Sequence, residues 1–171
     1  FISRLHDKKI GFDVFKGPAA RPVVIEDKSD TWSHNVFHFQ DAVGEFKATR
    51  VKRVEHGPVK SVIRVESEYG RSVLVQDFTM YRELDYIDVQ VTVDWRERFK
   101  MLKLAFPVNL QFTKQTYEIP YGFKEREHNG EEEPGQSWVD YGGIIPDEGT
   151  VYGLSLMNDA KYSYSILNKE L

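Results

Sequence analysis

The most chemically varied part of the sequence is the stretch between residues 117 and 136, which combines aromatic rings, carboxylates, an arginine and amides. Sugars need such a mixture, because aromatic faces stack on the apolar faces of pyranose rings while planar polar groups bind neighbouring hydroxyls. One interpretation is therefore a sugar-facing loop. The alternative, which composition alone favours, is a solvated acidic loop whose aromatic side chains pack on the core.

Carboxylates in this stretch raise the question of glycoside hydrolysis, which in a retaining enzyme needs two carboxyl groups about 5 Å apart. The residues concerned are Glu125 and the run Glu131–Glu133. Closeness in sequence does not set that separation, and runs of like charge usually mark a solvated surface. We therefore expect no catalytic pair here.

Two histidines, His34 and His38, lie four residues apart, which on a helix would place two metal ligands on one face. Their neighbours show no helical stripe, and in a strand the same spacing separates the side chains by about 13 Å. We therefore expect no local metal site. The other histidines, His6, His56 and His128, adjoin turn residues, and nothing pairs one of them with a glutamate as an aldose epimerase requires.

Each of the three tryptophans offers the flat face that a sugar platform requires. Trp95 closes an alternating apolar face and is expected in the core. Trp32 and Trp138 adjoin loop segments, so both remain open as platform residues.

These side chains must be positioned by strands, because the dominant periodicity of the sequence is two. Apolar and polar residues alternate from Ile87 to Trp95, and β-branched and aromatic residues dominate Val59–Ser67 and Val73–Tyr81. Turn-forming residues separate these segments. The three strands are therefore expected to form an antiparallel meander.

The same pattern recurs on both sides of this meander. Phe1–Leu5 and Phe12–Phe15 flank a five-residue turn, and Lys100–Val108 and Val151–Met157 are further strand predictions. The stretch Pro120–Gly149 is expected to be a long loop, because it is rich in Gly, Pro, Glu and Asn. Many short strands without a helical stripe predict an all-β fold, an antiparallel β-sandwich.

Composition narrows the class of protein. The 171 residues fit one domain, residues 1–171, and 40% apolar residues exclude a disordered segment. A net charge of −4 without a basic stripe disfavours nucleic acid as a partner, and no apolar run is long enough to span a membrane. The lack of cysteine excludes disulfides and suits a reducing compartment, hence a cytoplasmic location. The start at Phe1 and the end at Asn168–Leu171, where a new strand is expected to begin, look like cuts through a longer chain.

Several strings of residues, in order along nearly the whole chain, are long enough to be distinctive. They are Ile2–Gly11, His56–Val65, Val75–Arg82, Asp94–Glu97, Tyr117–Phe123, Asn129–Gln136 and Tyr152–Asp159. Together they resemble the C-terminal β-sandwich region of bacterial α-mannosidases of glycoside hydrolase family 38.

The resemblance implies a sandwich of the galactose-mutarotase-like type that follows the catalytic part of a longer enzyme. That family hydrolyses terminal α-linked mannose with retention of configuration. Its catalytic carboxylates and its ligands for zinc or another divalent metal belong to an N-terminal barrel and an adjoining helical region. None of those motifs occurs here, so no catalytic residue and no cofactor is expected in this chain. By the same resemblance, five residues are expected to line or support the sugar site: Tyr121, Glu125, Arg126, Asn158 and Asp159.

We therefore interpret the chain as a module of a metal-dependent α-mannosidase, inactive by itself, that packs on the catalytic barrel and helps to wall the sugar cleft. Its expected partners are the barrel and helical region of the same chain and a mannose-containing saccharide, with homo-oligomerisation left open. One alternative is an autonomous carbohydrate-binding module, which needs exposed aromatic side chains such as Trp32 or Trp138. Another is an interaction module, which needs an apolar patch on an outer sheet face.

Overall fold

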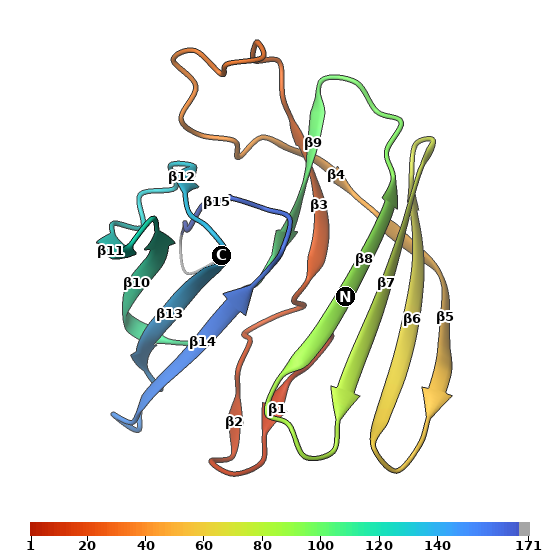
Figure 1. Cartoon of the computed structure of the whole chain (residues 1–171), viewed down its shortest axis with the longest axis vertical. Coiled ribbons are helices and arrows are strands. Elements are labelled where there is room, and N and C mark those ends of the chain that lie inside the picture. The colour runs from red at the N-terminus through yellow and green to blue at the C-terminus, as the bar shows by residue number, and fades with distance from the viewer. Residues whose placement is uncertain (168–171) are drawn as a thin grey trace. The chain divides into compact units, whose positions relative to one another are not determined.

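The computed structural model describes residues 1–167 of the chain. Within that range it consists of strands, turns and bends, without a helix (Figure 1). The strand expected to begin at Asn168–Leu171 lies outside the described residues. The nine strand pairs that have a defined register in the described residues are antiparallel, so the all-β fold class predicted from the period of two is confirmed. No helix that could cross a membrane occurs in the described range.

The chain divides into two compact units, which are described separately. One unit comprises Phe1–Arg21, Ser29–Asp41 and Lys103–Leu171, and the other comprises Pro22–Lys28 and Ala42–Leu102. We refer to them as the first and the second unit.

The second unit is built on a four-stranded meander in the order β5-β6-β7-β8. Its strands are β5 (Lys47–His56), β6 (Lys60–Tyr69), β7 (Ser72–Tyr81) and β8 (Ile87–Asp94). The pairing of β6 with β7 runs without interruption from Lys60 opposite Tyr81 to Tyr69 opposite Ser72. Gly70 makes the tight turn between them with a φ of 57°, a conformation that glycine adopts without steric cost. The meander predicted from the sequence is confirmed.

A small apolar cluster forms the core of the second unit. Leu74 of β7 is buried with Val24 and Phe46. Trp95 packs on this cluster, its ring centroid 6.3 Å from that of Phe46, so the prediction that Trp95 belongs to the core is confirmed. Val24 lies in β3 (Arg21–Glu26), the middle strand of a three-stranded sheet in the order β4-β3-β9, with β4 at Ala42–Glu45 and β9 at Lys100–Ala105.

An ion pair joins β6 to β7 on the polar face of the meander. Arg64 and Asp77 are directly opposite each other, and the guanidinium donates two hydrogen bonds, of 2.7 and 2.6 Å, to the carboxylate. The Asp77 side chain is 15% exposed and that of Arg64 is 38% exposed. The hydrogen bonds from Arg64 hold the pKa of Asp77 below its ordinary value of 3.8, because they stabilise the charged form.

We expect this pair to make stability depend on pH. A carboxyl group whose pKa is depressed by folding stabilises the folded state above its ordinary pKa, and the contribution disappears as the pH falls through the folded-state value. Asp77→Asn should therefore lower the free energy of unfolding by about 1 kcal/mol near neutral pH, since solvent screens the half-exposed Arg64. The deficit should shrink as the pH falls below 3.8, as followed by urea denaturation. A deficit that is the same at neutral and acidic pH would contradict this assignment.

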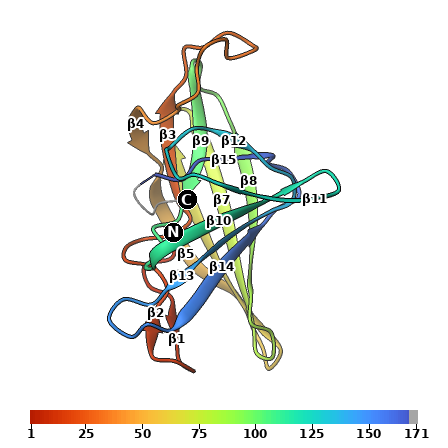
Figure 2. The same ribbon diagram turned by 90° about the vertical axis from the view of Figure 1, so that its left-hand side faces the viewer.

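The first unit is built on a second four-stranded sheet, in the order β11-β10-β13-β14. Its strands are β10 (Gln111–Ile119), β11 (Gly122–Arg126), β13 (Trp138–Ile144) and β14 (Val151–Met157). Figure 2 shows β10, β13 and β14 side by side, with the turn of the β10–β11 hairpin at one end. The strand predicted at Val151–Met157 is confirmed with the same bounds.

The prediction of a long loop over Pro120–Gly149 is wrong. The stretch contains β11, β13 and the two-residue β12 (Glu133–Pro134), which pairs with β15 (Ser163–Tyr164). A two-residue turn joins β10 to β11, and Tyr121 occupies it with a φ of 68°, a conformation that sequence composition does not announce in a non-glycine residue. The residues that suggested a loop therefore belong to a hairpin and a central strand.

The N-terminal segment of the first unit forms a hairpin, as predicted, but the strand predicted at Phe1–Leu5 is wrong. The first strand of the hairpin, β1, lies at His6–Asp7, and the second, β2, covers only Phe12–Asp13 of the predicted Phe12–Phe15. The hairpin contacts β14, since the Tyr152 hydroxyl donates a 3.1 Å hydrogen bond to Asp7 and its ring meets Phe12 edge-on at 5.3 Å. The strand predicted at Lys100–Val108 ends at Ala105 as β9.

Candidate functional site

The sheet β11-β10-β13-β14 has two chemically different faces, because side chains alternate along each strand. One face is buried: Tyr117, Val139 and Tyr141 are at most 1% exposed. We call the opposite face the outer face. It carries these side chains in neighbouring positions: Met157 and Ser155 of β14, Trp138 and Asp140 of β13, Glu118 and Thr116 of β10, Phe123 and Glu125 of β11.

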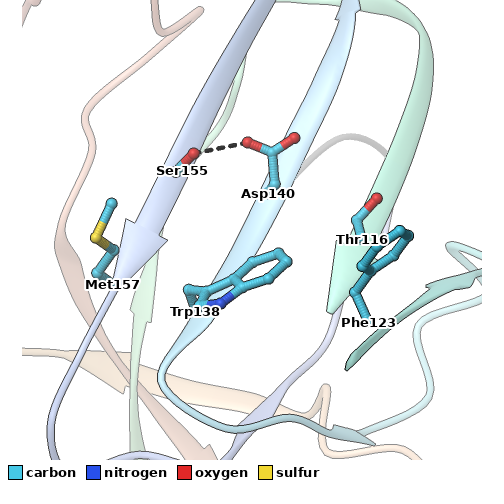
Figure 3. A pocket seen from close by; sticks show the side chains of 6 residues that line it. All are labelled: Thr116, Phe123, Trp138, Asp140, Ser155 and Met157. Carbon is cyan, nitrogen blue, oxygen red and sulfur yellow. Dashed lines mark hydrogen bonds between the residues drawn. The ribbon is translucent and has the colours of Figure 1, made fainter. Parts of the chain in front are cut away.

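A shallow hollow of about 410 Å³ lies on the outer face. Its volume falls in the usual range for small-ligand sites, about 300 to 1,000 Å³. Six side chains line it (Figure 3): Thr116, Phe123, Trp138, Asp140, Ser155 and Met157. We call this feature the Trp138 hollow.

The Trp138 hollow combines an apolar row with a polar row. Met157 lies opposite Trp138 in the pairing of β14 with β13, and Phe123 comes from the outermost strand, β11. The Phe123 side chain is 68% exposed and that of Met157 is 76% exposed. Two residue pairs further along the same two strands, Ser155 lies opposite Asp140. An exposed apolar surface therefore borders a row of hydrogen-bonding groups.

Asp140 is the centre of the polar row. The Ser155 hydroxyl donates a 2.6 Å hydrogen bond to its Oδ1 (Figure 3), and Thr116 faces it from β10. A carboxylate has about four acceptor positions on its two oxygens, so one serine hydroxyl does not exhaust it. Asp140 can therefore accept hydrogen bonds from a ligand while Ser155 fixes its orientation.

A pair of glycines lies next to Asp140 on the outer face. Gly142 of β13 is directly opposite Gly153 of β14. A Cβ added at Gly142 would lie 3.8 Å from the Oδ2 atom of Asp140, and one added at Gly153 would lie 4.0 Å from its Oδ1 atom. Bare backbone therefore borders the carboxylate, and a ligand can approach the sheet closely there.

Behind the hollow, Arg126 anchors the β10–β11 hairpin. Its guanidinium forms an ion pair with the Glu133 carboxylate and donates a 3.0 Å hydrogen bond to the Pro134 carbonyl. It also lies over the ring of Tyr117, 5.5 Å from the ring centroid, which is favourable for a cation and an aromatic face. Burial raises the pKa of Tyr117, and the Glu133 carboxylate raises it further. These groups are structural partners in the folded sheet.

The same network continues to the end of β14. The rings of Tyr117 and Tyr164 meet edge-on at 6.0 Å, and the Tyr164 hydroxyl donates a 3.0 Å hydrogen bond to the Gln136 carbonyl. The Asn158 amide donates to that same hydroxyl, while its Oδ1 atom accepts from the backbone of Ala160. Asn158 directly follows Met157, so this network fixes one rim of the Trp138 hollow.

The structure distributes the five predicted lining residues over different places. Arg126 and Asn158 belong to the network behind the hollow. Glu125 lies on the outer face beside Thr116, with the Lys114 ammonium 3.5 Å from its carboxylate. Tyr121 and Asp159 are exposed, in the hairpin turn and after β14. Contact of these residues with a sugar stays a prediction.

In the segment 29–41, Asp30, Trp32 and His34 form a separate small cluster. Asp30 accepts hydrogen bonds from the backbone of Trp32 and His34, and its Oδ2 atom lies 2.7 Å from the Nδ1 atom of His34. The Trp32 side chain is 80% exposed. No group of three or more His, Cys, Asp or Glu side chains in the described part of the chain is placed to hold a metal ion.

Among the residues that line the hollow, the sequence left Trp138 open as a platform residue and gave no sign of Asp140, Thr116 or Ser155. The available signal was the spacing of Trp138, Asp140 and Gly142, which occupy every second position. The predicted strand Val151–Met157 shows the same period of two. The signal is weak because two glycines follow in β13. The neighbours of Asp140 are also set by the register between three strands, which no single segment reveals.

Comparison with known proteins decides the family. The sequence profile of the C-terminal domain of glycosyl hydrolases family 38 matches residues 1–171. The chain belongs to this family. The family match confirms the resemblance to the C-terminal region of family 38 α-mannosidases. The match does not show that the source is bacterial.

Relatives of this family 38 C-terminal domain are much longer proteins. α-Mannosidase G of Dictyostelium discoideum is 26% identical over 185 residues, an alignment that covers 97% of this chain and 16% of the relative. α-Mannosidase 2C1 of Homo sapiens is 30% identical over 103 residues, which cover 56% of this chain and 9% of the human protein. The chain thus spans a small part of the curated relatives it matches.

A solved structure supports the fold of the family 38 C-terminal domain. The crystal structure of an α-mannosidase from Enterococcus faecalis V583 matches with a TM-score of 0.63 and 13% sequence identity. The match covers 98% of this chain and 26% of that chain. At this identity the likeness concerns the fold alone, and it confirms the antiparallel β-sandwich class.

Proposed function

We propose that this family 38 C-terminal domain is a non-catalytic module of a longer retaining α-mannosidase, which we call the parent enzyme. The parent enzyme would hydrolyse terminal α-linked mannose. The observation that carries the proposal is the family match over residues 1–171, combined with relatives that are α-mannosidases and of which the domain spans 16% or less. The strings shared with bacterial members support a bacterial source, and the lack of cysteine supports a cytoplasmic location.

The proposal places the divalent metal, zinc by resemblance, outside this chain. The described residues contain no group of three or more possible ligands, and a catalytic zinc site needs three protein ligands. The residues present therefore do not fit such an ion. The metal, together with the two carboxylates of a retaining mechanism, belongs in this proposal to the catalytic barrel and helical region of the parent enzyme.

The module would act by positioning. A misplacement of about 1 Å in a substrate can cost roughly a hundredfold in rate, so a rigid wall beside a cleft contributes without taking part in the chemistry. Arg126 and Asn158 support this role, because each fixes the backbone around an exposed segment. Tyr121, Glu125 and Asp159 are the exposed members of the predicted set and would face the sugar or the barrel.

A direct test compares the parent enzyme with residues 1–171 alone. Free mannose released from an α-linked mannobiose is measured for both, before and after removal of metal by a chelator and after zinc is returned. We expect hydrolysis by the parent enzyme, its loss on chelation and its return with zinc, and no hydrolysis by the chain alone. Mannose released by residues 1–171 would overturn the non-catalytic assignment. A parent enzyme that is inactive toward α-mannosides, or unaffected by chelation, would overturn the proposed reaction or its metal dependence.

A specific observation favours one alternative, an interaction module. On the face of the second unit's meander that also carries the buried Leu74 and Phe78, four apolar side chains are about half exposed: Ile63 at 46%, Met80 at 55%, Val91 at 40% and Val93 at 43%. Apolar surface of this kind often marks a contact with protein. The other alternative, saccharide binding, has the Trp138 hollow in its favour.

A further inference from the structure

We propose that the Trp138 hollow is a saccharide-binding subsite that takes one pyranose ring of a neutral oligosaccharide. The geometry of the outer face carries the proposal. The choice of mannose as the probe rests on the proposed function. The subsite itself does not require that function, because its ligand class follows from the side chains that line it.

The apolar part of the hollow suits one face of a sugar ring. Figure 3 shows the Trp138 indole extending across the sheet from β13 toward Thr116, with Phe123 beyond it and Met157 on the opposite side. Trp138 is half-buried and held between neighbouring strands, so little conformational freedom is lost when a ligand stacks on it. Aromatic rings of this kind provide a large contact area with little side-chain entropy.

The polar part distinguishes a sugar from an apolar ligand. Covering Asp140 with an apolar peptide would remove its carboxylate from water without new hydrogen bonds, which is costly for a charged group. A pyranose presents hydroxyl donors on its edge, and Asp140 has acceptor positions left beside the bond from Ser155. The hydroxyls of Ser155 and Thr116 can themselves donate or accept. Hydroxyl groups on a ligand can therefore form hydrogen bonds with Asp140, Ser155 and Thr116, whereas an apolar ligand would leave these side chains without new partners.

Charge on the outer face selects against anionic ligands. Asp140 lies in the hollow, and Glu118 and Glu125 occupy neighbouring positions on the same face. The nearby cation, Lys114, is already placed 3.5 Å from Glu125. Like charges at such short range repel, so uronates and sugar phosphates are disfavoured relative to neutral sugars.

The glycine pair adjoins the polar row of the hollow at Asp140 without itself lining the hollow. Gly142 and Gly153 place bare backbone beside Asp140, and the atoms nearest to a new Cβ at Gly153 would be 3.8 Å away. A side chain at this position would thus fit the fold, with its Cβ 4.0 Å from the Oδ1 atom of Asp140 at the edge of the polar row. Gly153→Val should block the subsite without destabilising β14, since β-branched residues favour strands.

The test uses the parent enzyme with its active site saturated by a tight iminosugar inhibitor, so that only other sites remain. Binding of an α-linked mannobiose is measured by isothermal titration calorimetry for Trp138→Ala, Asp140→Asn and Gly153→Val. Control variants are Trp32→Ala and Val151→Ala, two residues that are each 80% exposed and do not line the hollow. We expect each of the three hollow variants to weaken binding about tenfold, a change of ~1.4 kcal/mol, and both controls to bind like the unmodified enzyme.

Several outcomes would overturn the subsite. One is no heat of binding from the inhibited, unmodified enzyme, and another is equal binding by all variants. A loss confined to Trp32→Ala would move the site to the segment 29–41. Weakening by Trp138→Ala together with full binding by Asp140→Asn and Gly153→Val would indicate a general apolar surface. Hydrolysis by the uninhibited enzyme is measured in parallel: its persistence alongside failed binding would reject the subsite and keep the proposed function.

Discussion

Replacing Arg126 with methionine should lower the free energy of unfolding of residues 1–171 by about 3 kcal/mol, the lower end of the cost of breaking a buried ion pair. The side chains of Arg126 and Glu133 are 14% and 21% exposed. Removing the cation leaves the Glu133 carboxylate without its partner in a place with little water. It also removes the hydrogen bond to the Pro134 carbonyl and the contact with the Tyr117 ring.

A matched control for this variant exists on the same hairpin. Lys114 and Glu125 form an ion pair whose side chains are 75% and 61% exposed. Exposed pairs contribute about 0 to 1 kcal/mol, because solvent screens them and both side chains lose freedom. Lys114→Met should therefore change stability far less than Arg126→Met in the same urea denaturation experiment.

A double variant distinguishes the effect of the unpaired Glu133 carboxylate from the effect of the lost Arg126 contacts. Replacing a buried ion pair with apolar residues of similar volume is often neutral, so Arg126→Met combined with Glu133→Leu should recover most of the lost stability. A double variant as unstable as the single one would show that the Tyr117 and Pro134 contacts, and not the unpaired carboxylate, account for the loss. A single variant as stable as Lys114→Met would contradict the assignment of Arg126 as the anchor of the hairpin.

The meander of the second unit was predictable because each of its signals is local. Alternation in β8, β-branched residues in β6 and β7, and a glycine at the turn between them all lie within single segments. Trp95 was predictable for the same reason, since it continues the apolar face of β8. A strand that alternates without interruption announces both its existence and its buried face.

The strand β5 escaped prediction although it pairs with β6 along most of its length. Its register with β6 shifts between Ala48 and Arg50 and again between Arg53 and Glu55. Each extra residue moves the following side chains to the opposite face of the sheet. The apolar residues of β5 therefore show no period of two. The basic side chains of β5 weaken the apolar pattern further.

The candidate site was only partly predictable, because its chemistry is assembled across strands. The side chain of Trp138 alone left it open as a platform residue. Asp140 gains its role from Ser155 and Thr116, which come from strands on either side of it, and that neighbourhood depends on register. Tyr121 in a positive-φ turn and the glycines of β13 made a hairpin and a strand resemble a loop.

The two adjacent glycines of β13, Gly142 and Gly143, differ in the space available for a side chain. A Cβ at Gly143 would lie 2.7 Å from the Gln111 carbonyl oxygen and 3.1 Å from the Leu110 Cβ. The obstacle includes backbone of the paired strand β10, which cannot move aside without disturbing the ladder. A Cβ at Gly142, on the outer face, would have its nearest neighbour at 3.8 Å.

Gly143→Val should therefore destabilise the chain by about 3 kcal/mol, the upper end for overpacking. Gly142→Val should change stability by no more than about 0.5 kcal/mol, as an open surface position allows. Urea denaturation of both variants measures the contrast. Equal losses would mean that any side chain in this part of β13 is harmful, and that the glycines serve strand pairing and not access. If Gly142→Val folds like the unmodified chain yet weakens binding of the mannobiose, the bare backbone beside Asp140 is there to admit a ligand.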